Sequence, residues 1–162
     1  MNANLYPVPP TRRVMRGGYD HEVQDLDPPL QSRRRPRILL VEDDEALRSL
    51  IASELRRDGY RVIACEDGLE LVHRIDAYRE LGIPLGVSLV ISDVRMPKIS
   101  GLELLELTRE VPLKVPFILI SAFADMETRI EASHLSVSAF LSKPFEIDQL
   151  RAAVRANLRK DS

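Results

Sequence analysis

Residues 87–97 read VSLVISDVRMP, a mostly apolar run that closes with a carboxylate and a turn. A run of this kind is typical of a strand that is buried on both faces of a parallel sheet. Asp93 ends the run, and Pro97 follows shortly after, where a turn is expected. A carboxylate at the carboxyl end of a buried strand lies at the edge where open α/β sheets bind ligands. The stretch therefore predicts an α/β fold with a functional site around Asp93.

The same pattern recurs along the chain from residue 37 onward. Apolar strand candidates lie at 37–41, 61–65, 87–92, 115–120 and 138–142, and helical segments lie near 45–58, 68–80, 101–110, 125–134 and 146–159. Strands that alternate with helices predict a parallel sheet covered by helices on both faces. We expect a flavodoxin-like, five-stranded parallel sheet in the order 2-1-3-4-5, flanked by five helices.

Polar side chains stand where four of these strand candidates end. Asp43 and Asp44 follow the first, Asp93 the third, Ser121 the fourth and Lys143 the fifth. In the expected order the first and third strands are neighbours, so their carboxylates converge. Carboxylates this close raise one another's pKa, and a hard divalent cation such as Mg²⁺ relieves the repulsion. With an ammonium and a hydroxyl beside them, these groups suit a metal ion and a phosphoryl group.

These motifs resemble the receiver domain of two-component response regulators. The matching text is LLVEDD at 39–44, SDVRMP at 92–97 followed by Gly101, ISA at 120–122, and KPF at 143–145. Each motif closes a strand candidate, and the resemblance extends over residues 37–159. It implies a phosphoacceptor of a two-component or phosphorelay signalling system.

The resemblance also implies which residues hold the metal and the acceptor. Asp93 would be the phosphoacceptor and would take part in binding Mg²⁺. Asp44 would ligate Mg²⁺ directly, and Asp43 would do so mainly through water. The backbone carbonyl of Arg95 would supply another ligand.

Ser121 and Lys143 would hold the oxygens of the phosphoryl group by the same resemblance. The Lys143–Pro144 bond is expected to be cis. Phe140 lies where the family carries an aromatic switch residue, so phosphorylation would draw in the Ser121 hydroxyl and let the Phe140 ring move. The surface made by helix four, strand five and helix five would then change.

The implied function is that of a signalling switch, and the chain would not be an enzyme in the metabolic sense. It would take a phosphoryl group from the phosphohistidine of a sensor histidine kinase or a histidine phosphotransfer protein and catalyse its own phosphorylation. Output would run through protein contacts with a downstream partner at the helix 4–strand 5–helix 5 face. We expect a monomer or a weak homodimer.

Composition sets the broad class. The chain has 162 residues, of which 44% are hydrophobic, and its formal net charge of -2 does not favour nucleic acid as a partner. Its single cysteine, Cys65, cannot form an internal disulfide. No apolar run is close to the length of about 18 residues that a membrane span needs. We therefore expect a cytoplasmic protein without membrane insertion.

Residues 1–36 differ from the receiver domain expected at 37–162. They hold Pro7, Pro9, Pro10, Pro28, Pro29 and Pro36 and show no sustained apolar period, which predicts a flexible arm. The arm ends in the run RRRPR at 33–37. Since no output domain follows the last helix, we expect a stand-alone receiver.

One connection and one turn residue depart from the usual pattern of the family. The connection at 78–86 is longer than usual and is expected on the surface, away from the site. Ser136 stands where glycine is common, which predicts a strained or different turn. Arg95 and Phe123 flank the path of the hydrolytic water in the family, so the phosphorylated state is expected to be long-lived.

Other functions stay open from the residues alone. A phosphatase or phosphotransferase with an aspartyl-phosphate intermediate usually presents its nucleophile on the first strand, with a second Asp two positions on. The adjacent pair Asp43 and Asp44 does not match that spacing. In a flavin-binding module the acidic run 42–45 would repel the flavin phosphate. A DNA-associated regulator would use the arginines of the arm.

Overall fold

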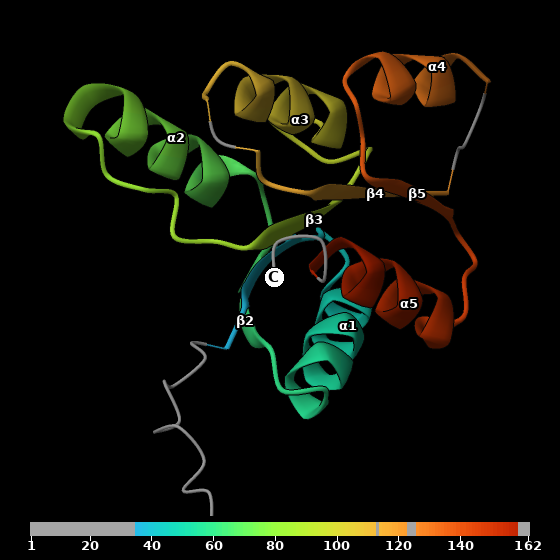
Figure 1. The fold of residues 1–162 in the computed structure, drawn as a ribbon. Coiled ribbons are helices and arrows are strands. Elements are labelled where there is room, and N and C mark those ends of the chain that lie inside the picture. The colour runs from blue at the N-terminus through green and yellow to red at the C-terminus, as the bar shows by residue number, and fades with distance from the viewer. Residues whose placement is uncertain (1–34, 113, 123–125, 159–162) are drawn as a thin grey trace, which may run out of the picture. The chain divides into compact units, whose positions relative to one another are not determined.

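The computed structural model describes residues 35–112, 114–122 and 126–158, which form alternating strands and helices (Figure 1). In chain order these are β1 (Arg37–Val41), α1 (Glu45–Arg57), β2 (Arg61–Cys65), α2 (Leu69–Leu81), β3 (Leu89–Asp93), α3 (Gly101–Arg109), β4 (Phe117–Ser121), α4 (Met126–His134), β5 (Ala139–Ser142) and α5 (Ile147–Leu158). Every predicted element is present. Except for residues 35 and 36, the predicted arm lies outside the described residues. None of the helices described is long and apolar enough to cross a membrane.

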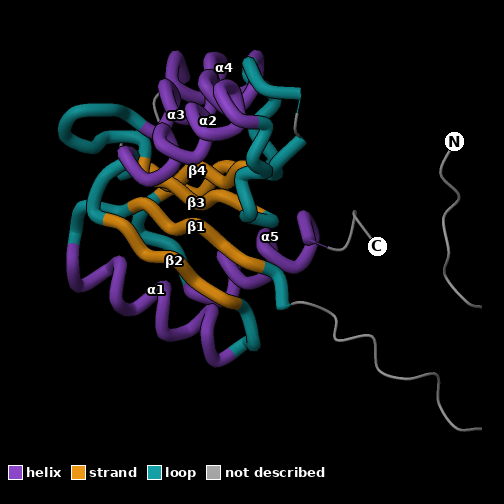
Figure 2. Tube along the Cα trace, turned by 90° about the vertical axis from the view of Figure 1, so that its left-hand side faces the viewer, coloured by secondary structure: helices purple, strands orange, loops and turns teal. Residues whose placement is uncertain are grey.

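The strands form one parallel sheet in the order β2-β1-β3-β4-β5, which confirms the predicted flavodoxin-like topology. Helices α2, α3 and α4 cover one face, and α1 and α5 cover the other (Figures 1 and 2). Right-handed crossovers explain this division, because the chain first moves outward from β1 to β2 and then in the opposite direction from β2 to β3, β4 and β5. The reversal places the topological switch point at the carboxyl ends of β1 and β3.

Alternate residues of β1 pack against the two helical layers. Ile38 and Leu40 belong to the core formed with α1 and α5, whereas Leu39 and Val41 belong to the core formed with α2, α3 and α4. All four are fully buried, and every residue of β3 and β4 is buried as well. The near-continuous apolar runs in the sequence are therefore the pattern that a sheet covered on both faces requires.

The long connection from α2 to β3, residues 82–88, lies at the amino ends of the strands. Arg37, the first residue of β1, donates a hydrogen bond to the Gly86 carbonyl at 3.1 Å, and Arg74 donates to the Leu85 carbonyl at 2.9 Å. The extra residues thus lie at the edge opposite the predicted site, as the sequence suggested.

The turn after α4 is strained at Ser136, whose φ of 55° lies in the left-handed region. Its N–H donates to the Ser133 carbonyl, and the N–H of Val137 donates to the Ala132 carbonyl, both at 3.0 Å. These bonds satisfy the last carbonyls of the helix in the manner usual for a glycine at this position. Ser136 therefore adopts a glycine-like conformation without being glycine.

Arg109 holds this turn from the end of α3. Its guanidinium donates to the carbonyls of Leu135 at 2.9 Å and of Ser136 at 3.1 Å. A third bond, to the Val115 carbonyl at 3.1 Å, ties the same side chain to the segment before β4. The guanidinium thus fixes the backbone on both sides of the left-handed residue and stabilises it.

Ser136→Gly should raise the free energy of unfolding by about 1 kcal/mol, because glycine adopts the left-handed conformation without the Cβ penalty. The matched control is Ser133→Gly within α4, which should lower that free energy by about 0.5 kcal/mol because glycine is a poorer helix former. Urea denaturation of both variants measures the difference. Destabilisation of similar size by both substitutions would contradict the left-handed assignment.

Candidate functional site

The register of β1 and β3 brings two carboxylates to the same edge of the sheet. Val41 lies opposite Ser92 in the parallel ladder. The next residues, Glu42 and Asp93, therefore reach the carboxyl edge side by side. Both are buried, with residue exposures of 1% and 7%. A pair of buried carboxylates at the switch point is the starting feature of the site.

Asp93 is the last residue of β3 and is held in a tight turn. Its Oδ1 accepts a hydrogen bond from the backbone N–H of Arg95 at 3.0 Å. Helix α3 begins directly against this turn: a Cβ added to Gly101 would lie 2.2 Å from the Asp93 carbonyl oxygen. The glycine of the sequence motif is required here because no side chain fits between α3 and the backbone of Asp93.

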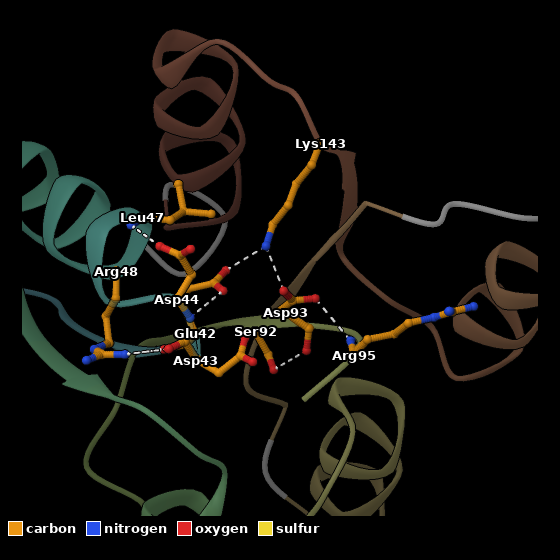
Figure 3. A network of polar contacts seen from close by, with 9 residues as sticks. All are labelled: Glu42, Asp43, Asp44, Leu47, Arg48, Ser92, Asp93, Arg95 and Lys143. Atoms are coloured by element: carbon orange, nitrogen blue, oxygen red, sulfur yellow. Dashed lines mark hydrogen bonds and ion pairs between the residues drawn. The ribbon is translucent and has the colours of Figure 1, made fainter. Parts of the chain in front are cut away.

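Lys143 follows β5 and reaches back to both carboxylates (Figure 3). Its Nζ donates to Asp93 Oδ2 at 2.6 Å and to Glu42 Oε2 at 2.9 Å. Burial disfavours the charged ammonium, but the hydrogen bonds to Asp93 and Glu42 outweigh this effect and raise the pKa of Lys143 above its ordinary value. The Lys143–Pro144 bond is cis, as predicted. Lys143 is thus a fixed positive charge at the sheet edge.

Glu42 is the site residue that the sequence analysis missed. Besides its bond to Lys143, its Oε1 accepts from the backbone N–H of Asp44 at 3.2 Å. Burial raises the pKa of the Glu42 carboxyl, and the bonds to Lys143 and to the Asp44 N–H partly offset this. The signal that could have found it is its position directly after Val41, ahead of the acidic pair that was chosen.

Three carboxylates lie close enough together to bind one cation. Glu42, Asp43 and Asp93 each offer an oxygen, and these atoms lie within 4.8 Å of one another. The donor set is all oxygen and partly exposed at Asp43, which suits a Mg²⁺ ion that keeps several waters. Three carboxylates beside one ammonium leave two formal negative charges, which a divalent cation balances. The described residues therefore fit the metal implied by the sequence.

The structure does not bring Asp44 into this cluster, although the sequence analysis expected it as the direct ligand. Asp44 is the N-cap of α1, and its Oδ1 accepts a hydrogen bond from the Leu47 N–H at 2.8 Å. A carboxylate in this position satisfies an unpaired donor of the first turn and interacts favourably with the helix dipole. Asp44 therefore starts the helix, and Asp43 is the acidic residue that turns toward Asp93.

Ser121 and Phe140 lie on the two strands beyond β3. Ser121 ends β4, is 1% exposed, and its carbonyl accepts a hydrogen bond from the Lys143 N–H at 2.8 Å. Phe140 lies within β5 and packs partly buried against the core shared with α2, α3 and α4. Arg129 of α4 lies over its ring, with 4.7 Å between the guanidinium carbon and the ring centroid, and donates to Ser142 Oγ at 2.6 Å.

Arg95 contributes its backbone N–H to the site, whereas its exposed side chain points away from Asp93 (Figure 3). This arrangement does not support the expectation that the guanidinium covers the acceptor. Phe123, the other residue expected along the water path, lies outside the described residues. The role of the Arg95 carbonyl as a metal ligand stays a prediction.

Comparison with known families identifies the same region. Residues 38–155 match the family model described as the response regulator receiver domain. An uncharacterized transcriptional regulatory protein of Bacillus subtilis, YkoG, is 36% identical over 124 residues, which are 76% of this chain and 51% of that protein. TrcR of Mycobacterium tuberculosis, a transcriptional regulatory protein, is 29% identical over 126 residues, which are 78% of this chain and 46% of that protein. The chain thus spans about half the length of these curated relatives.

Solved structures agree with the fold and with the family. The non-phosphorylated HemR receiver domain from Leptospira biflexa superposes with a TM-score of 0.64 at 30% identity, covering 76% of this chain and 94% of that one. The signal receiver domain of a Vibrio parahaemolyticus repressor protein gives a TM-score of 0.66 at 25% identity, covering 78% and 92%. Both neighbours are covered over nearly their whole length.

Proposed function

Because this chain belongs to the response regulator receiver domain family, we propose that it is phosphorylated on Asp93 by a phosphohistidine-bearing partner of a two-component or phosphorelay system. The observation that carries the proposal is the contact of Lys143 with Asp93 beside the three-carboxylate cluster. A nucleophile, a fixed cation and a divalent-metal donor set then occupy one sheet edge. Receiver domains are signalling proteins. The site therefore favours a signalling switch over a phosphatase or a flavin-binding module.

The transfer would proceed by attack of an Asp93 carboxylate oxygen on the phosphorus of phosphohistidine. The new O–P bond forms as the P–N bond breaks, and the imidazole leaves with the electron pair and takes up a proton. Lys143 would hold a phosphoryl oxygen, since its ammonium already lies 2.6 Å from Asp93 Oδ2. Ser121, at the end of the neighbouring strand, would donate its hydroxyl to another oxygen. Mg²⁺, when bound by Glu42, Asp43 and Asp93, would offset the negative charge of the transferring group.

The same site would act on the surface of β5 and α4. Phosphorylation that draws the Ser121 hydroxyl toward Asp93 would alter the packing around Phe140, which lies on the strand that leads to Lys143. Arg129 contacts both Phe140 and Ser142, so a change in β5 is passed directly to α4. Output would therefore run through protein contacts at the α4–β5–α5 face. The curated relatives that regulate transcription make control of transcription the process favoured for this output.

The phosphohistidine protein would dock beside Lys143. A pocket of about 230 Å³ is lined by α1 and by the segment that connects β5 to α5, and it includes Leu50, Pro144, Phe145 and the stem of Lys143. Leu50 is 54% exposed. An exposed apolar side chain next to the reactive edge favours contact with a partner that must deliver its phosphohistidine there.

Asp93→Asn should abolish the acid-labile, hydroxylamine-sensitive phosphorylation of the chain by acetyl phosphate or by a kinase. Asp44→Asn is the matched control: it removes a nearby carboxylate but keeps a good N-cap, so it should be labelled like the parent. Radiolabel incorporation measures both variants. Stoichiometric labelling of the Asp93→Asn chain at another carboxylate would reject the assignment of the acceptor.

Asp43→Asn should weaken Mg²⁺ binding by about tenfold or more, whereas Asp44→Asn should leave it within about twofold of the parent. The reason is that Asp43 belongs to the oxygen cluster and Asp44 caps α1. The chain has no Trp, so NMR shift titration is the suitable measurement. The reverse order of effects would restore Asp44 as the principal ligand and overturn the assignment made from the structure.

Leu50→Glu should slow phosphorylation about tenfold when the donor is the host kinase that labels the parent chain. The reason is that a charge replaces an apolar docking contact. Phosphorylation by acetyl phosphate, which needs no docking, should be unchanged. The matched control Leu81→Glu alters a leucine of α2 that is 71% exposed and should behave like the parent with both donors. Equal slowing with both donors would show that Leu50 affects the site itself and not the docking of a protein.

A further inference from the structure

A second surface of the molecule has the features of a binding groove. A cavity of about 630 Å³ lies between α3 and α4 and is lined by Glu106, Met126, Glu127, Ile130, Glu131 and Leu135. None of these residues takes part in the phosphoacceptor site. They also lie on a different side of α4 from Arg129, which contacts β5. The groove is therefore distinct from both the site and the α4–β5–α5 face.

The floor of the groove is apolar and exposed. Met126 and Ile130 are 74% and 49% exposed, which is unusual for side chains of this size. They are four positions apart on α4, and His134 continues the same line into the groove wall. Residues at this spacing form a stripe along one face of a helix. Met126 and Ile130 thus offer a partner an exposed apolar surface on the first half of α4.

The rim of the groove is acidic. Glu106 on α3 and Glu127 and Glu131 on α4 line it, and its lining includes neither lysine nor arginine. Within the described part of the chain none of these three glutamates forms an ion pair, although ten other ion pairs join described residues. Arg129, the arginine of α4, is engaged with Phe140 and Ser142. Any occupant that covers these carboxylates must therefore bring its own cations.

We propose that this groove binds an amphipathic helix of a partner protein, with apolar residues facing Met126 and Ile130 and with lysine or arginine facing the three glutamates. A groove between two helices is the setting in which a helix is laid in by its apolar face. From Met126 to His134 the stripe is about 12 Å long at the rise of an α-helix, so about two turns of the partner suffice to cover it. The charge of the rim selects a basic helix over an acidic one.

The full chain labelled with ¹⁵N should be titrated with a synthetic helical peptide of about 15 residues that carries leucine on one face and lysine on the other. Saturable shifts are expected for the amides of α3 and α4 around the groove. A peptide with glutamate in place of lysine, and a Leu/Lys peptide scrambled to lose its apolar face, should cause none. Binding of either control with similar affinity would overturn the proposal.

Two pairs of variants locate the contact. Ile130→Ser and Glu131→Lys should each lower the affinity for the Leu/Lys peptide by about tenfold. The matched controls Leu81→Ser and Glu80→Lys change exposed residues of α2. Their affinity for the Leu/Lys peptide should stay within about twofold of that of the parent. Parental affinity in both groove variants, or groove shifts that depend on chain concentration without peptide, would overturn the proposal. The latter result would assign the groove to a second copy of the chain.

Discussion

The contact of the Lys143 ammonium with Asp93 and Glu42 is the interaction on which the site depends. Each of these buried carboxylates would cost several kcal/mol if it met neither a cation nor enough hydrogen bonds. One ammonium meets both, and it does so only because β1 and β3 are neighbours and β5 ends at the same edge. The charge balance of the site therefore depends on the strand order and on the register of the sheet. A change in one of them separates the cation from the carboxylates it balances.

Arginine side chains stabilise the backbone at this edge of the sheet and in the connection that precedes β3. Arg48 donates to the Glu42 carbonyl at 2.7 Å, directly behind the acidic cluster, and Arg37 and Arg74 hold the connection that precedes β3. A guanidinium has five donors in a plane and can bind carbonyls of separate segments at once. Some of the 23 lysines and arginines of the chain are thus structural.

The sequence predicted every element because apolar runs and helical periods are local signals, but it named Asp44 where the structure gathers Glu42 with Asp43 and Asp93. Four acidic residues in succession, 42–45, give no local mark of where β1 ends. That point is set by pairing with β2 and β3, whereas the capping of Leu47 by Asp44 sets where α1 begins. Similarly, the starts of β3 and β4 depend on their partner strands. The contact of Arg129 with Phe140 joins a helix to a strand and leaves no trace in sequence spacing.

The strained turn after α4 has an evolutionary consequence. Ser136 keeps a left-handed backbone while Arg109 anchors the carbonyls around it. Loss of that arginine would be costly in the present background and cheaper after a change to glycine at the turn. The two positions are therefore epistatic, and the order of substitution matters. A lineage that reaches glycine first removes one of the constraints on Arg109, although its bond to the Val115 carbonyl remains. A lineage that loses the arginine first passes through a less stable intermediate.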